Sequence, residues 1–155
     1  MSNDEFLKLD NQLCFSLYAC SRSLTRLYRP LLNQLGITYP QYLVLMVLWE
    51  DKKQSVSTLG QRLLLDSGTL TPLLKRMEKN GLVQRIRSRE DERKVQIQLT
   101  DKGEKLKKQA YAVPEQMFCH SGLTVEEFVR VKEDLEALLK RIHKQSKIQE
   151  INTNK

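Results

Sequence analysis

Three cysteines, Cys14, Cys20 and Cys119, are the side chains of this sequence best suited to covalent chemistry. A cysteine reacts as its thiolate, so a reactive site has to stabilise an anion. Apolar residues surround Cys14 in the sequence, and desolvation alone would disfavour that charge. Donors such as tyrosine hydroxyls would favour it. On the residues alone, a small buried hydrophobe is the commoner role of a free cysteine, and we expect Cys20 to have that role.

The spacing of the metal-binding residue types predicts no metal site and no other cofactor. The cysteines and the two histidines, His120 and His143, form no CxxC or HxxxH pattern. Residues 1–10 are polar and carry acids, unlike a signal peptide, and no apolar run approaches the roughly 18–20 residues that span a bilayer. We therefore expect a cytoplasmic protein with no membrane partner, whose cysteines are not a structural disulfide framework.

Positive charge is concentrated in one segment of the chain. The 155 residues carry a formal charge of +7. Residues 75–108 hold twelve basic and six acidic side chains, a net of +6, whereas residues 1–74 carry +1 and residues 109–155 carry zero. A basic segment between neutral flanks is typical of a nucleic-acid-binding element. It argues against an enzyme, because catalysis does not need such a segment.

The first part of the chain has helical periodicity. Leucines at spacings of three, four and seven predict one helix over 10–35, kinked at Pro30 and ended by Gly36. Thr38 is the expected N-cap of a second helix, followed by a charged loop over 50–54. Ser55 or Ser57 would cap a short third helix.

A fourth helix is expected at about 67–80. Four apolar residues at i, i+3, i+4 and i+7 form its buried stripe: Leu70, Leu73, Leu74 and Met77. If Ser67 is its N-cap, Pro72 lies at the fifth helical position; if Thr69 is, Pro72 lies in the first turn. The sequence leaves both alternatives open.

The period then changes from helical to alternating. Residues 82–87 and 95–99 read as two strands joined by a charged tip. Thr100 caps a further helix that runs toward Cys119, residues 122–124 break the chain, and a last helix carries an apolar stripe of near-heptad spacing. Helix, turn, helix and basic hairpin predict a mainly α fold with a small β-hairpin wing, a winged helix-turn-helix.

Such a fold suits double-stranded DNA. Ser67, Thr69 and Thr71 near the start of the fourth helix could reach base edges in the major groove. The basic residues farther along it are better placed for phosphates, and those of the hairpin for a neighbouring minor groove: Lys75, Arg76, Lys79, Arg89 and Arg93. The alternative is that these charges are only solvated surface.

Two segments resemble a known family. Residues 66–103 resemble the recognition helix and wing of MarR-type regulators, including the Asp-x-Arg of the wing, Asp91 and Arg93. Residues 9–50 resemble the OhrR subfamily of organic hydroperoxide sensors through "NQLCF" and "ITYPQY". The resemblance implies a homodimer that binds operator DNA as a repressor and releases it on oxidation. It implies one domain over 1–155, with dimerisation helices at 10–35 and 105–147, a DNA-binding lobe at 38–104 and a wing at about 82–99.

The resemblance also implies roles for single residues. Cys14 matches the peroxidatic cysteine, Tyr28 and Tyr39 match the tyrosines that hydrogen-bond it, and Cys119 stands where two-cysteine members have a resolving cysteine. The DNA-contact region is matched by Ser67, Thr69, Arg76, Asp91 and Arg93. An apolar pocket at Cys14 would favour organic hydroperoxides over hydrogen peroxide.

Helix geometry adds one constraint to this site. Cys14 and Tyr28 are separated by about 21 Å of helical rise, so Tyr28 has to come from the partner subunit if both belong to one site. The resemblance implies that the oxidised product is an intersubunit Cys14–Cys119 disulfide, or a mixed disulfide with a small thiol if Cys119 does not resolve. Two other readings stay open: a repressor released by a phenolic ligand, and a thiol peroxidase.

Overall fold

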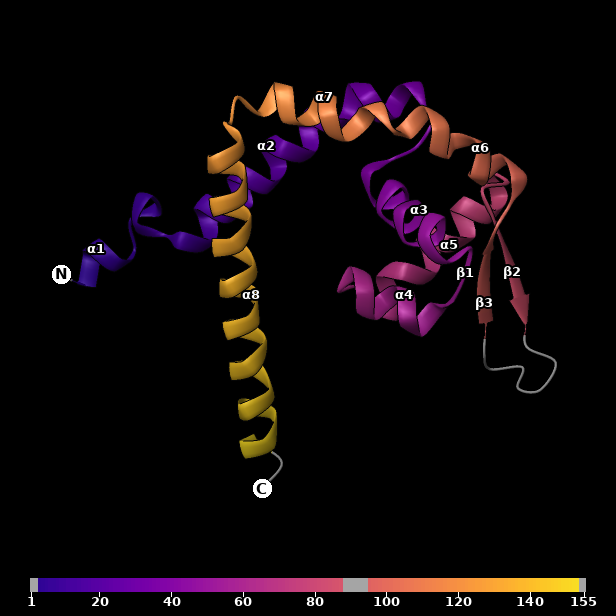
Figure 1. Cartoon of the computed structure of the whole chain (residues 1–155). Coiled ribbons are helices and arrows are strands. Elements are labelled where there is room, and N and C mark those ends of the chain that lie inside the picture. Colours follow the sequence, from indigo (N-terminus) through magenta and orange to yellow (C-terminus); the bar gives the residue numbers. More distant parts are fainter. Residues whose placement is uncertain (1–2, 88–94, 154–155) are drawn as a thin grey trace. The chain divides into compact units, whose positions relative to one another are not determined.

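The computed structural model describes residues 3–87 and 95–153. The chain divides into two compact units, Met1–Met117 and Phe118–Lys155, which are treated separately below. Most of the described residues are helical, and three short strands form one antiparallel sheet in the order β1-β3-β2 (Figure 1). The expectation of a mainly α fold with a small hairpin is confirmed.

The first expected helix, 10–35, begins three residues later than predicted and contains the whole leucine pattern. A helical turn, α1 (Asn3–Phe6), and a 3₁₀ turn, η1 (Leu9–Asn11), precede the long helix α2 (Leu13–Gln34). The helix continues through Pro30, and the chain leaves it at Gly36, whose φ of +66° suits a residue without a Cβ. Thr38 caps α3 (Tyr39–Asp51) as expected, and its backbone N–H donates to Oε1 of Gln41 at 2.9 Å.

The prediction of a charged loop at 50–54 is wrong. Helix α3 runs on to Asp51 and ends at Lys52, and β1 (Lys53–Ser55) then pairs antiparallel with β3 (Val95–Leu99). Three polar residues at a sheet edge show no alternation of apolar and polar types, so their pairing is set by the partner strand. The other partner of β3 is β2 (Val83–Arg87), which completes the expected hairpin.

The two helices of the helix-turn-helix have clear caps. Ser55 is the N-cap of α4 (Val56–Leu63), where its hydroxyl accepts from the N–H of Thr58 at 3.0 Å. Neither residue considered as the cap of α5 (Ser67–Lys79) has that role. The carboxylate of Asp66 accepts from the N–H of Thr69 at 2.9 Å, which places Pro72 at the sixth helical position.

The core of the first unit lies between these helices and the sheet. The four expected residues of α5 are all buried, together with Leu45 and Leu48 of α3 and Ile97 of β3. The indole Nε1 of Trp49 donates to the carbonyl of Gly103 at 3.0 Å, which joins α3 to α6 (Asp101–Ala110). This contact holds the helix that follows the hairpin against α3.

The helix expected from Thr100 to Cys119 is two helices, α6 and α7 (Ala112–Ser121). Thr100 caps α6 as expected, since its hydroxyl accepts from the N–H of Gly103 at 3.1 Å. The break falls at Tyr111, three residues before Pro114. A proline has no N–H for the carbonyl four residues back but is tolerated in a first turn, so the chain restarts with Pro114 as the third residue of α7.

The second unit is dominated by α8 (Val125–Thr153). Thr124 and Glu127 form a capping box at its start, with N–H to side-chain distances of 2.9 and 3.2 Å. Its expected apolar stripe is largely uncovered in the single chain, where side chains about 40–50% exposed include Phe128, Val131, Leu135, Leu139 and Ile142. Such an apolar face is typical of a helix that packs against another surface.

Within the described residues, no single helix has the length and apolar character to cross a membrane; α2 and α3, bent by 72°, pass that test only as a pair. In the same residues, no group of three or more His, Cys, Asp or Glu side chains is arranged to hold a metal ion.

Candidate DNA-binding surface and redox site

The outward face of α5 presents the side chains that the sequence assigns to DNA. Because the stripe from Leu70 to Met77 faces the core, the opposite side of the helix is left to solvent. Six contact residues were expected on α5. Thr71 is half-buried, and the other five are exposed: Ser67, Thr69, Lys75, Arg76 and Lys79. Their polar and basic character is that of a recognition helix.

The start of α5 is organised by Asp66, which the sequence analysis missed as a cap. Besides the N–H of Thr69, its carboxylate accepts the Thr69 hydroxyl at 2.8 Å, and these two bonds hold the pKa of Asp66 below its usual value. The hydroxyl proton of Thr69 is therefore engaged, and its oxygen is left to accept hydrogen bonds from outside. Aspartate directly before a helical stripe was the available sequence signal.

One acidic side chain links α5 to the hairpin. Oε1 of Glu78 accepts from the backbone N–H of Arg85 at 3.1 Å, and its other oxygen lies 3.9 Å from the Arg85 guanidinium. Glu78 thus sets β2 against the end of the recognition helix. Beyond it, Arg87 is exposed at the end of β2. The three expected wing contacts lie outside the described residues: Arg89, Asp91 and Arg93.

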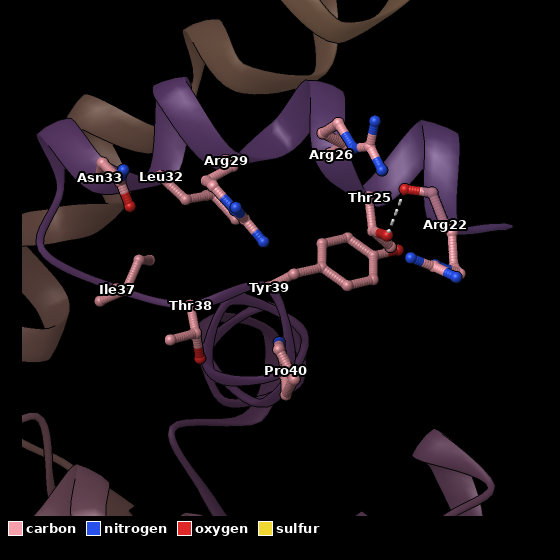
Figure 2. Close-up of a pocket in the computed structure, with 10 residues that line it drawn as sticks. All are labelled: Arg22, Thr25, Arg26, Arg29, Leu32, Asn33, Ile37, Thr38, Tyr39 and Pro40. Carbon is pink, nitrogen blue, oxygen red and sulfur yellow. Dashed lines mark hydrogen bonds between the residues drawn. The ribbon is translucent and has the colours of Figure 1, made fainter.

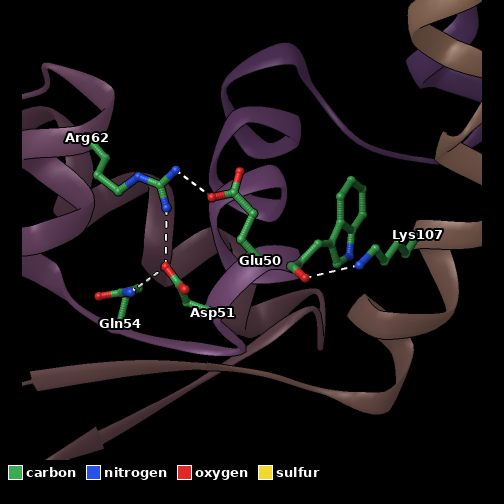
Figure 3. A network of polar contacts seen from close by, with 6 residues as sticks. Glu50, Asp51, Gln54, Arg62 and Lys107 are labelled. Atoms are coloured by element: carbon green, nitrogen blue, oxygen red, sulfur yellow. Dashed lines mark hydrogen bonds and ion pairs between the residues drawn. The ribbon is translucent and has the colours of Figure 1, made fainter.

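A second polar network ties α3 to its neighbours, and local spacing gave no signal for it (Figure 3). The Arg62 guanidinium of α4 lies 2.6 Å from Glu50 and 3.2 Å from Asp51, and Gln54 donates to the same aspartate at 2.8 Å. On the other side of α3, the Lys107 ammonium donates to the carbonyl of Trp49 at 3.1 Å. Exposed ion pairs add little stability, so the network mainly orients the helices.

Cys14, the expected reactive cysteine, is the second residue of α2 and is exposed in the single chain. Its apolar neighbours are exposed as well, 62% for Leu13 and 40% for Phe15, so one chain alone does not enclose it. The expectation that Cys20 is buried is wrong for the single chain, where it faces solvent. Cys119 lies on α7, is exposed, and belongs to the second unit.

The two expected tyrosines lie together at the other end of α2. The ring of Tyr28 is 4.8 Å from that of Tyr39, the first residue of α3, and 6.1 Å from that of Tyr42. Burial raises the pKa of Tyr28 and of Tyr39, so both hydroxyls keep their protons and can donate at neutral pH. Since α2 is continuous from Leu13 to Gln34, about 21 Å of helix separates Cys14 from Tyr28 of the same chain.

A cavity of about 380 Å³ opens beside Tyr39, between α2 and the start of α3 (Figure 2). Arg22, Arg26 and Arg29 project from α2 toward it. No sequence motif pointed to this cavity, because it exists only where the two helices meet.

Comparison with known proteins identifies the family. The family model described as transcriptional regulator SarA/Rot matches residues 26–110. The organic hydroperoxide resistance transcriptional regulator of Bacillus subtilis is 49% identical over 142 residues, which make up 92% of this chain and 97% of the relative. This chain is a MarR-family transcriptional regulator of the organic hydroperoxide resistance type. The resemblance inferred from residues 9–50 and 66–103 is thereby confirmed.

Solved structures of relatives share the fold of this MarR-type regulator. Reduced AbfR bound to DNA has a TM-score of 0.72 at 44% identity, covering 91% of this chain and 99% of that chain. AbfR, a protein of Staphylococcus epidermidis, has also been solved overoxidised on DNA, with a TM-score of 0.71 at 43% identity over 91% and 99%. The disulfide form of AbfR has a TM-score of 0.62 at 44% identity, covering 90% of this chain and 95% of that chain. A cysteine-to-serine mutant of MarR from E. coli has a TM-score of 0.64 at 25% identity, covering 83% of this chain and 96% of that chain. The winged-helix prediction is confirmed.

Proposed function

We propose that this regulator is a repressor that binds operator DNA as a homodimer and is released when an organic hydroperoxide oxidises Cys14. One observation carries the proposal: the continuous helix α2 separates exposed Cys14 at its start from half-buried Tyr28, whose ring lies against that of Tyr39 on α3. If Cys14 and this tyrosine pair form one site, they have to come from two different copies of the chain. The redox site is therefore formed by two subunits, and oxidation acts on their arrangement.

The uncovered apolar faces support the homodimer. Exposed Leu13, Phe15 and Tyr18 surround Cys14 on α2, and α8 carries its own uncovered stripe. We assign dimerisation to helices within 10–35 and 105–147. Packing these faces against a second copy removes apolar surface from water and encloses the thiol, which suits an organic oxidant better than hydrogen peroxide.

The chemistry needs no cofactor. The Cys14 thiolate attacks the terminal oxygen of R–O–OH; an S–O bond forms, the O–O bond breaks, and the alkoxide takes a proton to give the alcohol. Sulfur is oxidised by two electrons and the peroxide is reduced by two. The hydroxyls of Tyr28 and Tyr39, protonated at neutral pH, donate hydrogen bonds to the thiolate before attack.

Cys119 of the partner subunit is the proposed resolving thiol. Its thiolate attacks the sulfenic sulfur of Cys14, an S–S bond forms, and hydroxide leaves to become water. AbfR has been solved in a disulfide form, and its overoxidised form has been solved on DNA. These forms of a relative support the disulfide, rather than oxidation of one sulfur, as the event that releases the operator.

DNA binding is assigned to α5 and the hairpin. Ser67 and Thr69 face base edges, with Thr71 partly covered, while Lys75, Arg76 and Lys79 contact phosphates. Arg89, Asp91 and Arg93 of the wing complete the interface. Reduced AbfR has been solved bound to DNA, which supports the same partner here.

A gel shift with the operator region upstream of the regulator's own gene tests the proposal. Cumene hydroperoxide should release wild-type protein and Cys20→Ser, the matched control, while Cys14→Ser stays bound. On a non-reducing gel, a dimer band should form in wild type and Cys20→Ser and be absent in Cys14→Ser and Cys119→Ser.

Three results would contradict the mechanism. Full oxidation that leaves only monomer would exclude the intersubunit disulfide. Release of Cys14→Ser from DNA by a phenolic compound, with no response of wild type to peroxide, would make the protein a ligand-controlled repressor. Many turnovers of peroxide with a thiol donor and no gel shift would make it a thiol peroxidase.

A further inference from the structure

The cavity between α2 and the start of α3 has an unusually basic lining. Arg22, Arg26 and Arg29 lie at i, i+4 and i+7, so they share one face of α2, and all three line the cavity (Figure 2). The Arg22 guanidinium also donates to the Tyr18 hydroxyl at 3.3 Å. Among the residues that the structure describes, no acidic side chain lines it. Where side chains are described, none of the three arginines forms an ion pair. Three like charges on one helix face repel each other, and a bound anion relieves that repulsion.

The opposite wall adds to the positive potential. Thr38, Tyr39 and Pro40, the beginning of the 13-residue helix α3, line the cavity from the other side. A helix start carries a partial positive charge. In the part of the chain that the structure describes, nothing accepts the backbone N–H of Tyr39. The cavity thus combines three arginine side chains with the start of a helix.

The rest of the lining is mixed, with Thr25 and Asn33 as its polar residues and Leu32 and Ile37 as its apolar ones. Leu32 and Ile37 close the cavity near the turn between the helices. Its volume of about 380 Å³ falls in the range of small-molecule sites and exceeds what a lone carboxylate fills. A ligand that satisfies both parts of the lining has an anionic end and a hydrocarbon body.

We propose that this cavity binds the carboxylate of an acidic organic hydroperoxide and so sets the regulator's preference among peroxides. The inference rests on the proposed function, because Tyr39 is both a wall of the cavity and a member of the tyrosine pair assigned to the partner's Cys14. The arginines hold the carboxylate, and the hydrocarbon body extends past Tyr39 toward the thiolate. The carboxylate takes no part in the reaction; it raises the local concentration of one class of oxidant.

The test compares a straight-chain hydroperoxy carboxylic acid with its own methyl ester. Rates of Cys14 sulfenic acid formation are measured in the dimeric Cys119→Ser protein, where that product accumulates. We expect the acid to react about fivefold to tenfold faster than the ester at low salt, a preference that two or three ion pairs can supply. In Arg26→Gln/Arg29→Gln the ratio should fall to about one. Lys108→Gln, which removes an exposed charge from α6, should leave it unchanged.

The ratio of the rate with the acid to the rate with its ester tests this inference separately from the proposed function on which it rests. A ratio near one in the Cys119→Ser protein, with Cys14 still oxidised by the ester and by cumene hydroperoxide, overturns the cavity assignment and leaves the peroxide sensor intact. A preference that persists in the double arginine variant also overturns it. If no hydroperoxide oxidises Cys14, the proposed function and the inference fail together. Because each rate is divided by that of the matched ester, a general loss of thiol reactivity cannot imitate the expected result.

Discussion

Replacing Gly103 with alanine tests how the hairpin is held against the rest of the lobe. A Cβ at this position would lie 2.3 Å from the carbonyl oxygen of Leu82 and 2.7 Å from a methyl group of Leu99. The leucine side chain can move, but the carbonyl is fixed, since it accepts from the N–H of Thr100 at 3.2 Å and from its hydroxyl at 3.0 Å. The clash therefore has to separate α6 from the start of the hairpin.

The expected magnitude is the difference of two effects. Overpacking costs about 1–3 kcal/mol, and contact with fixed backbone places Gly103→Ala near the upper end. Alanine has a higher helix propensity than glycine, which adds about 1 kcal/mol to the free energy of unfolding. The free energy of unfolding should fall by about 2 kcal/mol, and more if the 3.0 Å bond from Trp49 to the Gly103 carbonyl is lost.

Urea unfolding at a fixed protein concentration measures this change, and the single tryptophan, Trp49, reports on it directly. Operator affinity, measured by fluorescence anisotropy, should fall as well because β2 begins directly after Leu82. Gly36→Ala is the matched control. Its φ is +66° and nothing lies within 4 Å of the added Cβ, so it pays only the conformational cost of about 1 kcal/mol. If Gly103→Ala were as stable as wild type, the close approach of α6 to the hairpin would be disproved.

Three further predictions concern the DNA-binding helix and the redox site. Arg76→Gln should weaken all operators alike and reduce the slope of log affinity against log salt by about one; an unchanged slope excludes a phosphate contact. Asp66→Ala should lower stability more at pH 7 than in acid. Bonds from Thr69 hold the Asp66 pKa low, so the ionised carboxylate adds stability above its ordinary pKa, and this part is lost as pH falls through the folded pKa; urea midpoints at pH 7 and at successively lower pH check this. Tyr28→Phe should slow Cys14 oxidation. Burial raises the Tyr28 pKa, so the rate of Cys14 oxidation in wild type, plotted against pH, should show no inflection from tyrosine ionisation below pH 10. Such an inflection would contradict the role of Tyr28 as a protonated donor.

Much of the fold could be predicted because its signals are local. The stripe from Leu70 to Met77 identified α5, and alternation identified the hairpin strands that became β2 and β3. The errors arose where local signals compete or are absent. Three polar residues gave no sign of β1, and Pro114 ended one helix and began another where continued periodicity suggested a single element.

The sequence by itself determined the distance between Cys14 and Tyr28, because the rise of a helix is fixed once both residues lie on it. It also determined which face of α5 is basic. Only the tertiary structure decided what surrounds the tyrosines. The tilted contact between the rings of Tyr28 and Tyr39 and the cavity lined by the arginines of α2 both depend on how α3 turns back against α2 after Gly36. The angle and contacts of two packed helices follow from side chains along both, so neither helix's own periodicity contains them.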